Sequence, residues 1–128
     1  MSRRTPQFIV AAIAALALVP AAAFAASLCV QGGSGSMTAS LSGTTVTVKG
    51  SVTDTSADGA CVYIKAEIVR TAGHNPDRDI AKACGKGTKK SGSWTFTSYV
   101  GIPTHVDAKI CRDRIGPDDC TSKRVSFS

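Results

Sequence analysis

The five cysteines carry the most specific chemistry in this 128-residue sequence. In an exported chain, cysteines are expected to form disulfides, and an odd number leaves one without an intrachain partner. Cys111 and Cys120 flank a Gly-Pro turn signal, so the strand ends on either side of it can return to bridging distance. Cys61 opens a strand, and Cys84 lies late in the segment that follows. We therefore predict Cys61–Cys84 and Cys111–Cys120 disulfides and an unpaired Cys29.

Cys29 lies four residues after Ala25, where we expect an N-terminal export signal, described below, to be cleaved. The simplest interpretation is a thiol on a frayed end of the mature chain. One alternative is an intermolecular bridge, which would give a disulfide-linked dimer, and another is a different internal pairing. A zinc site is not expected, because no two cysteines are closely spaced and His74 and His105 lie at no familiar ligand spacing.

The residues that could support catalysis are few. Hydrolysis needs a nucleophile with a base and an orienting group, or two opposed carboxylates. The chain has two histidines, and Glu67 is its only glutamate. His105 near Asp107 is the best base candidate, but two residues that lie two apart in a strand share one face and form a surface pair equally well. We predict no catalytic residue, and a small secreted enzyme is kept as an alternative.

Two groups of acidic side chains are weak candidates for cation binding. Asn75, Asp77 and Asp79 alternate like the opening of a calcium loop, but Ile80 and Lys86 stand where glycine and glutamate are required. A second acidic group consists of Asp113, Asp118 and Asp119, and neighbouring arginines can neutralise its charge. We predict neither a metal site nor a cofactor.

A concentration of cations is the strongest binding candidate. It comprises Arg78, Lys82, Lys86, Lys89 and Lys90, and no acid occurs between positions 81 and 93. Such a run is usually a solvated face, but it would also attract an anionic ligand with a strength that salt screens. We therefore predict a binding surface between Ala72 and Gly92, with an anionic cell-envelope polymer or polysaccharide as the expected partner.

The elements that position these residues are short strands. Apolar side chains alternate with polar ones in several stretches: Met37 to Leu41, Val46 to Val52, Val62 to Ile68, Trp94 to Ser98, Val106 to Ile110, and Val125 to Phe127. This period of two predicts at least six strands, the first two joined in a hairpin. Between Thr71 and Ser93 the alternation disappears, which predicts a long loop with one helical turn near Asp79 to Ala83. The fold class is an antiparallel, immunoglobulin-like β-sandwich, with a closed barrel as the alternative.

The N-terminus has the pattern of a secretory signal peptide. A charged start at Arg3 and Arg4 is followed by an apolar run from Phe8 to Val19 and by small residues around Ala25. We expect residues 1–25 to be removed, leaving 26–128 as one secreted domain, with twin-arginine export, a membrane anchor and a lipoprotein as alternatives. Loss of the two arginines lowers the net charge from +6 to +4. This balance is too modest to predict nucleic-acid binding.

Several short stretches resemble small secreted β-sandwich proteins of actinobacteria. They run from Asp54 to Cys61, from Ala83 to Thr88, and around Cys111 to Cys120. The chain is more distantly similar to the enediyne-binding apoproteins of the neocarzinostatin type, which carry a chromophore in a sandwich cleft. The first resemblance implies export and the two disulfides but no activity, and the second implies a small-molecule carrier. The predicted function is therefore secreted, non-enzymatic binding of an unidentified ligand, with a small-molecule carrier as an alternative.

Overall fold

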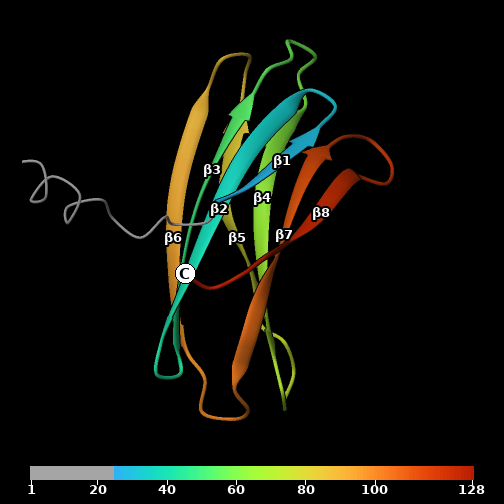
Figure 1. Ribbon diagram of the computed structural model, residues 1–128. Helices are drawn as coiled ribbons and strands as arrows, with labels where there is room; N and C mark the ends of the chain where they lie inside the picture. The colour runs from blue at the N-terminus through green and yellow to red at the C-terminus, as the bar shows by residue number, and fades with distance from the viewer. Residues whose placement is uncertain (1–24) are drawn as a thin grey trace, which may run out of the picture.

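The protein is an all-β sandwich of two four-stranded antiparallel sheets (Figure 1). The computed structural model describes residues 25–128, so the predicted signal, residues 1–25, lies outside the described residues except for its last position. Sheet A has the order β1-β2-β3-β6, and sheet B has the order β5-β4-β7-β8. The strands are β1 (Ala26–Val30), β2 (Gly33–Ser42), β3 (Thr45–Asp54), β4 (Cys61–Arg70), β5 (Asp77–Cys84), β6 (Lys89–Thr97), β7 (Pro103–Asp113) and β8 (Asp119–Val125). The predicted antiparallel sandwich is confirmed.

The alternating stretches of the sequence form the two inner faces of the sandwich. Val46, Val48 and Val52 of β3 are fully buried and face the equally buried stripe of β4, which includes Ile64 and Ile68. The predicted β2–β3 hairpin turns at Gly43, whose φ of 63° is readily adopted by glycine. No helix that could cross a membrane occurs in the described part of the chain.

The predicted long loop between Thr71 and Ser93 is wrong. Strand β5 and the first half of β6 occupy this segment, and no helical turn forms near Asp79 to Ala83. β5 is an edge strand of sheet B, so most of its side chains remain exposed. A bulge leaves Ile80 out of register, because Ile64 pairs with Ala81 and the next residue of β4 pairs with Asp79. Exposure and the bulge together erase the period-two pattern that marks a strand.

The two ends of the described chain also differ from the expectation. The N-terminal end is not frayed, because residues 26–30 form β1, which pairs with β2 along its whole length and buries Leu28. At the other end β8 stops at Val125, and Phe127 makes an isolated parallel bridge to Ala39 of β2. Both ends therefore join the body of the sandwich.

Both predicted disulfides are present, and each one fastens an edge strand of sheet B to an inner strand. Cys61–Cys84 joins β4 to β5, and Cys111–Cys120 joins β7 to β8. In each bridge the two cysteines are directly opposite in the strand register. The small core of this domain therefore receives covalent support at both edges of one sheet.

Glycines bring the two sheets close together. Gly50 of β3 and Gly92 of β6 are register partners, and a Cβ at Gly92 would lie 2.0 Å from the carbonyl oxygen of Ile80. On β2, a Cβ at Gly33 would lie 2.6 Å from the side chain of Val62. Side chains at these positions would push sheet A away from sheet B.

We expect Gly92→Ala to destabilise the protein by about 1 to 3 kcal/mol, because the added methyl group must displace the backbone of β5. Ser93→Ala, at the exposed neighbouring position, should change stability by less than about 0.5 kcal/mol. Urea unfolding of both variants measures the difference. Equal stability of the two variants would contradict the close approach of β5 to β6.

Removing either disulfide should also lower the free energy of unfolding. Loop-closure entropy assigns about 3.5 kcal/mol to Cys61–Cys84 and about 2.7 kcal/mol to Cys111–Cys120. We therefore expect the Cys61→Ala/Cys84→Ala variant to be the less stable of the two double variants. Urea unfolding under oxidising conditions compares both with the wild type, and an unchanged midpoint in either would contradict the expectation for that bridge.

Candidate functional site

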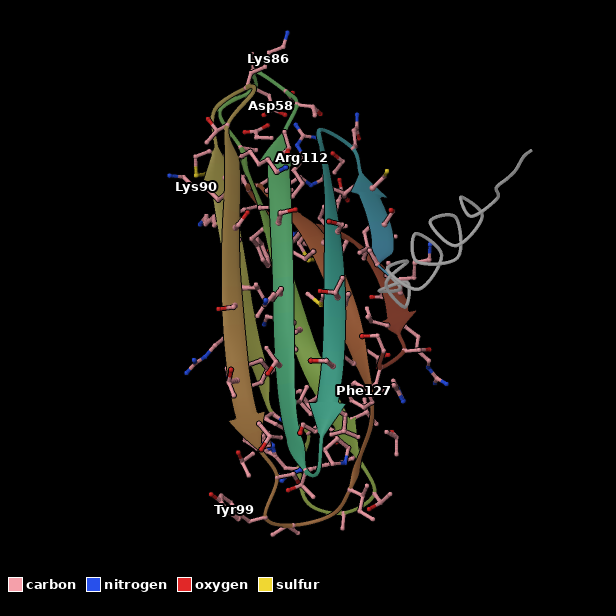
Figure 2. The ribbon with its side chains drawn as sticks, turned by 60° about the vertical axis from the view of Figure 1, so that its left-hand side comes forward. Asp58, Lys86, Lys90, Tyr99, Arg112 and Phe127 are labelled. Carbon is pink, nitrogen blue, oxygen red and sulfur yellow. A yellow bond between two sulfur atoms is a disulfide. The ribbon has the colours of Figure 1, made fainter. Side chains whose placement is uncertain are left out.

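Three of the five predicted binding cations lie together at one end of the sandwich. Lys86 stands on the turn between β5 and β6, and Lys89 and Lys90 begin β6. All three are exposed, and Figure 2 shows Lys86 at the tip of this end and Lys90 on the side of the sandwich below it. Among residues 25–128, none of the three has a carboxylate partner within 4.0 Å. We call Lys86, Lys89 and Lys90 the basic end.

The other two predicted cations have partners within the fold. The Lys82 Nζ lies 3.3 Å from an Asp113 carboxylate oxygen on the outer face of sheet B. The Arg78 guanidinium carbon lies 5.5 Å from the centroid of the Trp94 ring, so this side chain bridges the edge strands β5 and β6. The predicted group of five therefore divides into three lysines with no ion-pair partner in the described part of the chain and two cations engaged in intramolecular contacts.

A buried aspartate holds the turn that carries Lys86. Asp54, at the end of β3, is fully buried, and its carboxylate accepts hydrogen bonds from the backbone N–H groups of Ser56 and Gly85 at 3.0 and 2.9 Å. Its backbone carbonyl accepts a bond from Gly87, and its N–H donates to Thr88. The turn is thus fixed on both sides of Lys86. The residues around Asp54 in the sequence did not predict this role.

The outer face of sheet A is an array of hydroxyl groups that the sequence analysis also missed. Five successive rows of register partners cross β2, β3 and β6, and they contain thirteen Ser or Thr residues and two lysines. The rows are Ser34-Thr53-Lys89, Ser36-Ser51-Ser91, Thr38-Lys49-Ser93, Ser40-Thr47-Thr95 and Ser42-Thr45-Thr97. None of these residues is buried. We call this surface the hydroxyl face.

The hydroxyl face contains a shallow depression of about 490 Å³. Hydroxyl groups from the second row line it, together with Lys49 and Ser93 of the third row. Gly50 and Gly92 form its floor, at the point where sheet A approaches Ile80. The missing side chains of these two glycines therefore draw the outer surface inward.

Acidic groups are concentrated away from the hydroxyl face. Asp54, whose side chain is buried, is the only acid on the strands of sheet A. The outer face of sheet B and the adjoining loops carry ion pairs: Lys65–Asp79 at 3.9 Å, Lys82–Asp113 at 3.3 Å, Arg114–Asp119 at 3.3 Å, and Arg112–Asp58. Figure 2 places Asp58 and Arg112 near Lys86, so the carboxylate there is already neutralised. The two outer faces thus differ in charge.

The two residues considered for catalysis lie apart from the basic end, towards the opposite end of the sandwich. His105 Nε2 is 3.4 Å from an Asp107 carboxylate oxygen on β7, which makes the surface pair that the spacing allowed. Within residues 25–128, no three His, Cys, Asp or Glu side chains converge in a way that could hold a metal ion. Cys29 is exposed and has no disulfide partner, and it pairs in register with Ser34 beside the hydroxyl face.

The loop between β6 and β7 forms an apolar end opposite the basic end. Tyr99, Val100 and Ile102 are 90%, 55% and 60% exposed, and Figure 2 shows Tyr99 at the far end of the sandwich from Lys86. Arg70 holds this loop, because its Nη1 donates to the Ser98 hydroxyl at 3.2 Å and to the Val100 carbonyl at 3.1 Å. The loop is therefore anchored although its side chains point into water.

The phenol of Tyr63 is tied to the loop between β7 and β8. Its hydroxyl donates to a carboxylate oxygen of Asp118 at 2.6 Å. This hydrogen bond, with smaller effects from desolvation and from the charge of Asp118, raises the pKa of Tyr63 from 10.0 to about 12. The protonated phenol is therefore the form that the fold favours.

Comparisons with protein-family models, curated proteins and solved structures return no match for this chain. Function must therefore be inferred from the surfaces described above.

The raised pKa of Tyr63 predicts a pH dependence. Because the folded pKa lies above that of the unfolded chain, the stabilising contribution is present below pH 10 and is lost as the pH rises through about 12. In a Tyr99→Phe background, Tyr63 is the sole tyrosine, so absorbance near the phenolate band should titrate with a midpoint of about 12. Adding Asp118→Asn should lower this midpoint towards 10. An unchanged midpoint would show that Asp118 is not the cause.

Proposed function

We propose that this protein is a secreted, non-enzymatic binding protein that engages an anionic polymer through its basic end. The single observation that carries the proposal is the grouping of Lys86, Lys89 and Lys90 on an anchored turn and an adjoining strand, with no carboxylate partner among residues 25–128. Positively charged groups that are not neutralised within the fold raise the local concentration of an anionic ligand. Anionic cell-wall polymers and acidic polysaccharides are the ligands of this charge that an exported protein meets first.

Secretion is part of the same proposal. The charged start, apolar run and small-residue site of residues 1–25 favour export, and the two disulfides are compatible with an oxidising compartment. We further propose an immunoglobulin-like classification. Two observations support it: β3 pairs with β6 while β4 pairs with β7, and the intervening connections cross between the sheets.

Lysines on edge strands have a second physical role, because they discourage pairing with the strands of other molecules. Lys89 and Lys90 lie on β6, which is an edge of sheet A. The two roles differ in their consequences: loss of edge protection promotes self-association, whereas loss of a binding site weakens retention by a polyanion.

We expect Lys86→Gln/Lys89→Gln/Lys90→Gln to weaken binding to immobilised acidic polysaccharide at low salt by about 3-fold to 150-fold, since three exposed charge contacts are each worth about 0.2 to 1 kcal/mol. The charge-matched control is Lys109→Gln/Lys123→Gln/Arg124→Gln, which removes three exposed cations from β7 and β8. Wild-type binding should fall steeply as salt is added.

Biolayer interferometry measures the affinities, and light scattering reports self-association of the same samples. Equal loss in both triple variants would show that net charge alone governs binding. An aggregating triple variant with unchanged affinity would assign the lysines to edge protection and overturn the proposed function.

A further inference from the structure

We propose that the anionic polymer binds along the hydroxyl face, and that the ligand is therefore an acidic polysaccharide rather than a polyanion without hydroxyl groups. This inference rests on the proposed function and extends it from charge to substrate class. The basic end alone would attract any polyanion. The surface that continues from it decides which polyanion forms further contacts.

The chemistry of the hydroxyl face favours a ligand that both donates and accepts hydrogen bonds. Each Ser or Thr hydroxyl supplies one donor and two acceptor lone pairs. A partner that covers the face must satisfy these groups, because a polar group buried without a partner costs free energy. An apolar protein surface would leave them unpaired, and a phosphate chain would satisfy only the donors. A sugar polymer supplies both kinds of group along its length.

The charge on the hydroxyl face favours an acidic polymer. Lys49 lies in its third row, and Lys89 lies in its first row, where the face meets the basic end. No exposed carboxylate occurs on the strands of this sheet, whereas the outer face of sheet B mixes Glu67, Asp79 and Asp107 with lysines. A carboxylated or sulfated chain therefore meets cations without exposed acids on one outer face, and charges of both signs on the other.

The dimensions of the hydroxyl face favour an extended ligand. Its five rows repeat every second residue, which gives a length of about 27 Å, and its three strands span about 10 Å. The depression above Gly50 and Gly92 lies in the middle of this strip and is open to solvent. Because Ser and Thr side chains are short, they also lose little conformational entropy when a polysaccharide binds to them. A single sugar unit would leave most of the strip uncovered.

The test removes hydroxyl groups without changing charge. Ser36→Ala/Ser51→Ala/Ser91→Ala deletes one complete row, and Thr55→Ala/Ser122→Ala/Ser126→Ala removes three exposed hydroxyl groups from elsewhere on the molecule. The protein expressed from the full-length sequence is titrated at low salt with polygalacturonate, an acidic polysaccharide, and with polyphosphate, a polyanion without hydroxyl groups. Thermal unfolding confirms that each variant is folded.

We expect the row variant to lose about tenfold in affinity for polygalacturonate and to bind polyphosphate within twofold of the wild type. The control variant should bind both polymers like the wild type. If the row variant does not fold, Ser93→Ala/Thr95→Ala replaces it, because this variant removes two exposed hydroxyl groups of the same face without changing its charge.

The outcomes separate the two proposals. If binding of polygalacturonate depends on the basic end but is unaffected in the row variant, binding along the hydroxyl face is overturned and the proposed function remains intact. Equal losses for polyphosphate and polygalacturonate also overturn binding along the hydroxyl face, because the row would then act without regard to sugar hydroxyls. If the wild type binds neither polymer, the proposed function is overturned, and so is the proposal of binding along the hydroxyl face.

Discussion

The close approach of the two sheets over glycine is the constraint on which the rest of this structure depends. Between Gly33, Gly50 and Gly92 on one side and Val62 and Ile80 on the other there is no space for further side chains. Ala, Val and Ile fill most of the remaining interior, and Leu28, Met37 and Trp94 are the larger buried residues, so the core is thin for a domain of this length. Burial alone therefore provides little reserve of stability, and the disulfides supply part of what the core does not.

The same constraint shapes the outer surfaces. Because Gly50 and Gly92 face the core where sheet A approaches Ile80, the outer surface is drawn inward there and forms the depression on the hydroxyl face. Other contacts hold the edge strands in place. Two disulfides fasten β5 and β8 to the inner strands of sheet B, and Arg78 lies over Trp94 between β5 and β6. Asp54 then anchors the turn that presents Lys86. The basic end is consequently a fixed part of the scaffold rather than a flexible loop.

Prediction from the sequence succeeded where a strand has one side in the core. Val46 and Val48 of β3 and Ile64 of β4 alternate cleanly with polar residues, so their strands and buried faces were recognisable. It failed for β5, where both edge exposure and the bulge at Ile80 remove the alternation. The hydroxyl face was visible in the sequence as alternate Ser and Thr residues, but three separate strands had to be placed side by side before it became one surface.

The sequence by itself determined the class of fold, the inward-facing stripes and the two disulfide pairings, because these depend on local periodicity and on turns that bring neighbouring strand ends together. Only the tertiary structure decided which cations are free and which are occupied. Lys82 is neutralised by Asp113, 31 residues away, and Arg78 rests on Trp94 of another strand, whereas Lys86 has no such partner among the described residues. Pairing between distant side chains depends on strand order and register, and neither can be deduced from the local sequence around each lysine.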